Sequence, residues 1–195
     1  EDKIFYLSDE NKVKYIENKI KLLNDKNLQI PDAEIIREII SWLECCPWYF
    51  TNEILTNVIN RILELSENKT NKNIINAFLN HEYLIDNKNT TINQFYNLFK
   101  AKNKQRLENW CIDYLKNTVA NLNNFSNQLA RLERVLEQNN LNVPKALSDL
   151  IVKNNFYIPD LSKDINYNLW DFCHSMCYFI VKKMPDQKEA LRNYL

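Results

Sequence analysis

The chain has 195 residues, 25 basic and 25 acidic side chains, and no glycine. It therefore lacks phosphate-binding loops, the nucleophile elbow of many hydrolases and the glycine turns of tight β-hairpins. The balanced charge argues against nucleic-acid binding, which usually leaves a basic excess. We expect an all-α fold, an irregular bundle of seven to nine helices joined by turns of Pro, Asn, Asp and Ser.

Apolar residues at helical spacing predict five helices in the first half of the chain. Their expected starts are Ser8, Pro31, Thr51, Thr70 and Thr91, which are capping residues or a proline at the first helical position. The polar segment 86–90 between the last two helices is the best linker candidate. We expect one domain over residues 1–195. The alternative is a subdivision of the chain near residues 86–91.

A helical seam of apolar or small residues runs from 107 to 136. Its members are Leu107, Cys111, Tyr114, Thr118, Leu122, Phe125, Leu129, Leu132 and Leu136. The period stays in phase through 121–127, although the asparagines there are poor helix formers. We therefore expect one long, straight or bent central helix. Either other helices of the chain cover this seam, or a second copy does so in a homodimer.

The C-terminal part contains the most apolar segment of the chain. Val143-Pro144 and Ile158-Pro159 predict two helix starts, and nearly every residue from Leu169 to Val181 is apolar. A helix that is apolar on all sides is buried on all sides. We expect a fully buried C-terminal helix that stops at Pro185, followed by a short terminal helix.

The cysteines bear on the compartment in which the protein works. Their number is odd and all of them lie among apolar residues, which predicts free, buried thiols. The five residues are Cys45, Cys46, Cys111, Cys173 and Cys177. The expected location is the cytoplasm or a reducing cytosol into which the chain is delivered, although a secreted form with its signal removed stays open. No apolar run reaches the ~20 residues of a membrane span.

Weak catalytic candidates lie in the apolar C-terminal segment. Asp171, His174 and Cys177 are spaced so that a helix could bring them together as a Cys-His-Asp relay. The simpler interpretation is a core histidine bonded to Asp171 or to a backbone carbonyl. Cys173, His174 and Cys177 offer at most three ligands where structural zinc takes four. We predict no metal and no cofactor.

The aromatic run Trp48-Tyr49-Phe50 follows Cys45-Cys46-Pro47 at the end of a predicted helix. Aromatic side chains gather at protein interfaces, so we predict these three as partner-binding residues. The alternative is that the rings fill a gap between two helices.

These observations favour a non-enzymatic helical module that binds a protein partner, as an adaptor, an effector or an immunity-type inhibitor. One alternative is an enzyme with a carboxylate or histidine site in a cleft between helices. A second is a nucleic-acid-binding protein that uses the basic run Lys100, Lys102, Lys104 and Arg106.

Overall fold

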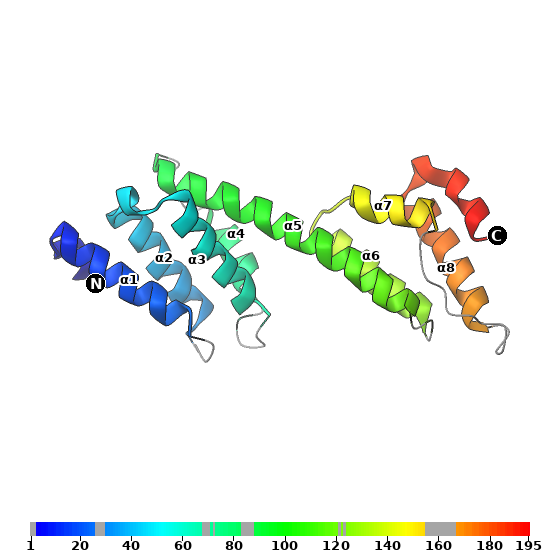
Figure 1. Cartoon of the computed structure of the whole chain (residues 1–195), viewed down its shortest axis with the longest axis horizontal. Coiled ribbons are helices and arrows are strands. Elements are labelled where there is room, and N and C mark those ends of the chain that lie inside the picture. Colours follow the sequence, from blue (N-terminus) through cyan, green and yellow to red (C-terminus); the bar gives the residue numbers. More distant parts are fainter. Residues whose placement is uncertain are drawn as a thin grey trace. The chain divides into compact units, whose positions relative to one another are not determined.

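The structure is a computed structural model that describes residues 3–25, 30–67, 71, 73–82, 88–120, 122, 124–154 and 167–195 (Figure 1). Within these ranges the chain forms helices and turns but no strand, which confirms the predicted all-α fold. The described elements are eight α-helices and three 3-10 helices, which are η1 (Lys3–Tyr6), α1 (Asp9–Leu23), α2 (Asp32–Cys45), η2 (Pro47–Tyr49), α3 (Asn52–Leu65), α4 (Ile74–Glu82), α5 (Thr90–Ala120), α6 (Phe125–Gln138), α7 (Lys145–Val152), α8 (Tyr167–Lys183) and η3 (Pro185–Asn193).

The contacts within the chain divide it into two compact units. Unit 1 comprises Glu1–Lys104 and unit 2 comprises Gln105–Leu195, so the boundary falls inside α5 and not within the segment 86–91. Each unit has its own cluster of buried apolar side chains.

The core of unit 1 contains a cluster of aromatic rings from α4 and α5. The ring of Phe78 lies 5.9 Å from that of Phe95 and 5.7 Å from that of Phe99, between centroids. Tyr96 packs edge-on against Phe95 at 5.4 Å, and all four side chains are at most 2% exposed. Aromatic pairs in such tilted arrangements add stabilisation beyond their buried area.

In unit 2, α6 packs along α8 in the same chain direction. The Asp171 carboxylate accepts a hydrogen bond from the backbone N–H of Ser126, which joins the N-terminal ends of the two helices. Lys183 forms an ion pair with Glu137 at their C-terminal ends. The parallel arrangement places one side of α8 against α6 along most of its length.

Asparagine takes the conformations that glycine usually supplies. In the described part of the chain, the residues with positive φ are Asn124, Asn140 and Asn154, with φ of 59°, 48° and 46°. Asn140 follows the end of α6, where Leu141 N–H donates to the Leu136 carbonyl and Asn140 N–H donates to the Glu137 carbonyl. These two bonds form a Schellman motif, which satisfies carbonyls left over at a helix end. The chain thus ends this helix in the left-handed conformation without glycine.

Most of the predicted helix starts are correct to within a residue. The Thr51 side chain accepts a hydrogen bond from Ile54 N–H, so it caps α3 as predicted. The start of α5 differs, because Asn89 and not Thr91 supplies the capping oxygen, which accepts from the N–H groups of Thr91 and Ile92. The N-cap positions of α2 and α7 are occupied by Pro31 and Pro144. The sequence predicted each proline at the first helical position, so each helix begins one residue later than expected. Thr70 and Pro159 lie outside the described residues.

The prediction of one continuous helix over 107–136 is wrong. α5 ends at Ala120 and α6 begins at Phe125, after Asn124 in the left-handed conformation. Four residues, 121–124, separate the two helices in the sequence, close to the 3.6 residues of one helical turn, so the apolar residues on either side stay in phase although the helix breaks. The long helix is α5 itself, with 31 residues. The seam from Cys111 to Leu136 is buried mainly in the core of unit 2, and homodimerisation through it stays a prediction.

The prediction of a fully buried C-terminal helix is also wrong. One side of α8 is buried, through Phe172, Met176, Phe179 and Ile180. The opposite side is open to solvent, with Trp170 and Tyr178 each 59% exposed. An apolar sequence on all sides therefore does not bury this helix on all sides.

Candidate functional site

The exposed side of α8 carries aromatic rings at regular helical intervals. Trp170, His174 and Tyr178 follow each other at steps of four residues, so they lie along one face, and all three are exposed. The rings of Trp170 and His174 are stacked, with centroids 4.9 Å apart and planes 15° apart. The nearby Val181 is 51% exposed. We call these four residues the α8 face.

A groove of about 410 Å³ runs beside the α8 face, between α6 and α8. On the α6 side it is lined by the small side chains of Ser126 and Ala130 above the buried Leu129. On the α8 side it is lined by the rings of His174 and Tyr178. The groove thus has a wall of small side chains and a wall of rings.

A cross-helix ion pair lines the same groove. Lys182 Nζ lies 2.6 Å from the carboxylate of Glu133, which is a mostly buried side chain. The ammonium group also lies 5.7 Å from the centroid of the Tyr178 ring. The hydrogen bond from Lys182 to Glu133 raises the pKa of Lys182, so the ammonium group stays charged and neutralises the buried carboxylate.

The structure does not assemble Asp171, His174 and Cys177 into a relay. The Asp171 carboxylate caps α6, with its Oδ2 3.0 Å from Ser126 N, and His174 stacks on Trp170. The Cys177 thiol faces the Tyr194 carbonyl, 3.9 Å away, and burial raises the pKa of this thiol, which disfavours the reactive thiolate. In the described part of the chain no hydrogen bond joins any two of the three. His174 is exposed, so the interpretation of a core histidine is wrong as well.

The three predicted partner-binding residues lie in different environments. Trp48 is 59% exposed, Tyr49 is half-buried, and Phe50 is buried in the core of unit 1 at 6% exposure. The rings of Tyr49 and Phe50 pack edge to face, 5.4 Å apart. Burial and the nearby Glu17 carboxylate raise the pKa of Tyr49. Of the three, Trp48 is the one whose ring is mainly open to a partner.

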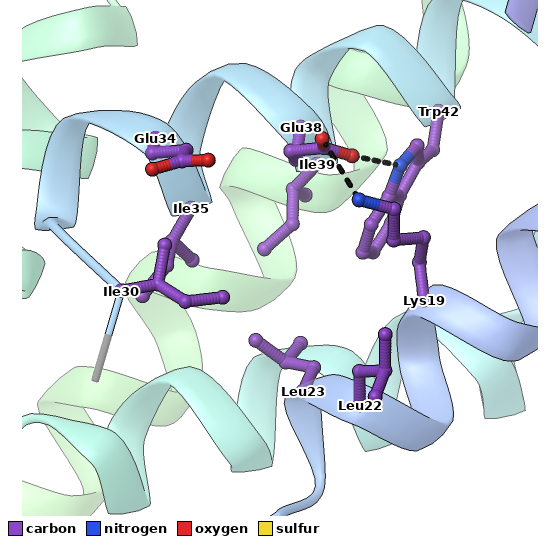
Figure 2. A pocket seen from close by; sticks show the side chains of 9 residues that line it. All are labelled: Lys19, Leu22, Leu23, Ile30, Glu34, Ile35, Glu38, Ile39 and Trp42. Atoms are coloured by element: carbon purple, nitrogen blue, oxygen red, sulfur yellow. Dashed lines mark hydrogen bonds and ion pairs between the residues drawn. The ribbon is translucent and has the colours of Figure 1, made fainter. Parts of the chain in front are cut away.

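Unit 1 contains a small pocket of about 60 Å³ between α1 and α2, which the sequence analysis missed (Figure 2). Its inner surface is apolar, and its rim carries Glu34, Glu38 and Lys19. Glu38 accepts from Lys19 Nζ at 3.2 Å and from the Trp42 indole N–H at 3.1 Å. The sequence signal was a pair of carboxylates one turn apart on α2, which is common on solvated helices.

The lysine of this pocket is held in its charged state. Burial by itself lowers the pKa of Lys19, but hydrogen bonds to Glu38 and Tyr15 and the charges of both groups outweigh this effect. The net result is a raised pKa. The ammonium group also lies 5.3 Å from the centroid of the Tyr15 ring.

The five cysteines are free thiols, as predicted. Cys45, Cys46 and Cys111 are buried, whereas Cys173 and Cys177 are half-buried. Burial, followed by the charge of Glu108, raises the pKa of the Cys111 thiol to about 11. A search of the described residues finds no group of three His, Cys, Asp or Glu side chains that could hold a metal ion.

The basic run on α5 is partly engaged within unit 1. Lys100 Nζ lies 2.7 Å from the carboxylate of Glu82, in an ion pair between α5 and α4. Part of the positive charge that a nucleic acid would contact is therefore neutralised inside the chain.

These features define an all-α protein with two compact units and a different solvent-open site on each. A scan against protein-family models, a search of curated proteins and a search of solved structures each find no match to the chain. Every helix in the described ranges is too short or too polar to cross a membrane.

Proposed function

We propose that this chain is a helical protein-interaction module and that the α8 face, with the adjoining groove, is its main contact surface. The observation that carries the proposal is the exposure of Trp170, Tyr178 and Val181 on one face of a helix whose opposite face is buried. Contiguous apolar patches on soluble proteins often mark interaction sites. Tyrosine and tryptophan are also enriched among the residues that dominate binding energy.

The groove favours a partner that presents an amphipathic helix. Helices dock into grooves through apolar anchors spaced three or four residues apart. The small side chains of Ser126 and Ala130 leave room for such anchors, and the rings of His174 and Tyr178 provide the opposite wall. With 17 residues, α8 is roughly 25 Å long at 1.5 Å per residue, which matches several turns of a docked helix.

The electrostatics of the groove support an apolar mode of recognition. The Glu133 carboxylate already pairs with Lys182, and Glu137 pairs with Lys183. The charges near the groove are therefore largely compensated within unit 2. A partner helix would gain most from burying the rings and little from forming new ion pairs.

Site-directed photo-cross-linking in the organism that produces the chain tests this proposal. A benzophenone side chain at position 178 should capture a discrete partner, and the same group at position 145 on α7, where the lysine side chain is 87% exposed, should not. The captured protein is then purified, and its affinity is measured against single variants of the chain.

Tyr178→Ser and Trp48→Ser form a matched pair, because both side chains are 59% exposed. We expect Tyr178→Ser to weaken binding of the purified partner by about tenfold or more, and Trp48→Ser to leave it unchanged. Loss of binding in Trp48→Ser alone would instead place the contact at the aromatic run of unit 1. If the captured protein is a second copy of the chain, the partner is the chain itself, and the proposal that a different protein presents the docked helix is wrong.

A further inference from the structure

The pocket between α1 and α2 combines an apolar interior with a rim on which, among the described residues, negative charge exceeds positive charge. Its interior is formed by the buried side chains of Leu23, Ile35 and Ile39, which are at most 5% exposed. An engineered apolar cavity of about 150 Å³ accommodates benzene, so the 60 Å³ here corresponds to about two or three methylene groups. The pocket thus fits a short aliphatic chain.

The charges around the rim do not balance. Glu34 and Glu38 lie on successive turns of α2, and Lys19 reaches from α1 to Glu38 (Figure 2). Within the described residues, Glu34 forms no ion pair. The rim therefore carries two carboxylates and one ammonium group, a net charge of about −1 at neutral pH.

Glu38 already has an ion-pair partner in Lys19, whereas Glu34 has none among the described residues. Lys19 donates to Oε1 of Glu38, and the Trp42 indole donates to Oε2. Both carboxylate oxygens of Glu38 are thus already engaged, whereas the Glu34 carboxylate lines the same pocket and is exposed. The exposed Leu22 provides an apolar approach to the pocket.

From this combination we infer that the pocket binds a primary alkylammonium group, with its methylenes on the apolar interior and its charge at the Glu34 carboxylate. This chemistry occurs at the end of a lysine side chain and in short free alkylamines. A carboxylate ligand would be repelled by the rim, and a neutral alkyl group would leave Glu34 without a counter-charge. The inference does not depend on the role proposed for the α8 face, which belongs to the other unit.

NMR titration of the folded 195-residue chain tests the inference, with the Trp42 indole N–H as the reporter because it donates to Glu38 at the pocket rim. The probes are 1-butylammonium and Nα-acetyl-lysine methylamide, with 1-butanol as the neutral control, at constant ionic strength. We expect saturable shifts of the Trp42 resonance at millimolar concentrations of 1-butylammonium and much smaller shifts with 1-butanol. Saturation by the blocked lysine as well assigns the site to lysine side chains, and saturation by 1-butylammonium alone assigns it to free amines.

Two variants on α2 provide a matched comparison. Glu34→Gln removes the carboxylate at the rim, and Glu44→Gln removes an exposed carboxylate of the same helix that does not line the pocket. We expect Glu34→Gln to weaken 1-butylammonium binding at least fivefold, and Glu44→Gln to leave it unchanged. Equal weakening in both variants, an equal response to 1-butanol, or the absence of a saturable shift in the wild type would each overturn the inference.

Discussion

Unit 1 and unit 2 differ in how they present their aromatic side chains. In unit 1, the rings described on regular helices are buried, as for Phe78 and Phe95, or half-buried, as for Tyr15, and the exposed rings of Tyr6 and Trp48 lie in short 3-10 segments. In unit 2, Trp170 and Tyr178 are exposed on a helix of 17 residues. A regular helix that is anchored by its opposite face holds such rings in fixed positions, and recognition sites benefit from rigid support. This difference between the units supports the proposal that the partner binds at α8.

The candidate sites of the two units also differ in size and charge. The pocket of unit 1 is small, with two carboxylates near one ammonium group. The groove of unit 2 is larger and lined by rings, and its buried carboxylate is paired. We therefore expect charge to dominate ligand selectivity at the first site, and shape and apolar area to dominate it at the second.

The largest expected loss of stability follows from removing a buried ring from the core of one unit. Phe95→Ala removes a buried ring from unit 1 and Phe179→Ala removes one from unit 2, at a cost of about 3–5 kcal/mol each. The buried thiols report on each unit, Cys46 in unit 1 and Cys111 in unit 2. We expect Phe95→Ala to accelerate the native-state labelling of Cys46 more than that of Cys111, and Phe179→Ala to do the opposite. Equal acceleration of both thiols in each variant would show a single cooperative unit.

Alkaline pH should lower the stability of unit 2, because the buried Cys111 thiol loses its proton. Its thiol pKa is raised from 9.0 to about 11, so the native state retains its proton longer than the unfolded state. The associated stability is fully present below about pH 9 and is lost as the pH rises to about 11, to a total on the order of 2 kcal/mol. Urea denaturation across this range should show a shallower pH dependence for Cys111→Ala than for the wild type. Parallel curves for the two proteins would contradict the prediction.

The hydrogen bond between the N-terminal ends of α6 and α8 should contribute less to stability than the buried rings. Asp171→Ala removes the acceptor of the Ser126 N–H, and we expect a loss of about 1–2 kcal/mol in the unfolding free energy of unit 2. Asp171→Asn keeps a side-chain oxygen and should retain part of this stability. Thermal unfolding of both variants provides the measurement. A wild-type midpoint for Asp171→Ala would show that the bond does not stabilise the helix pair.

The smallest effect concerns the α8 face. Tyr178→Ser replaces a side chain that is 59% exposed, so we expect a change in the unfolding free energy within about 0.5 kcal/mol. Chemical denaturation of this variant measures it. A loss above about 2 kcal/mol would mean that the ring stabilises unit 2 and is not reserved for a partner.

The absence of glycine, together with the helical spacing of apolar residues, was enough to predict the all-α fold and most helix starts. The break between α5 and α6 was hidden because a connection of about one turn preserves the apolar phase. Asn124 was the residue that marked it, since asparagine tolerates the left-handed conformation better than other residues with a side chain.

The candidate sites were harder to predict, because burial depends on which helices pack together. The apolar run in α8 contains His174 and Tyr178 on its exposed side, and no local pattern separates this side from the buried one. In the same way, Phe50 and Trp48 are two residues apart, yet one is buried and the other is exposed. The pocket of unit 1 forms only where α1 and α2 pack together. The spacing of residues within a single helix does not predict which helices pack together.

Hydroxyl-radical footprinting with the purified partner tests the central claim most directly, because it measures the exposure of individual side chains. Trp48 and Tyr178 begin with the same exposed fraction, 59%, and so provide an internal comparison. The account predicts that the saturating partner strongly reduces the oxidation rate of Tyr178, relative to its rate in the free chain, and leaves that of Trp48 unchanged. Protection of Trp48 with no protection of Tyr178 would contradict it.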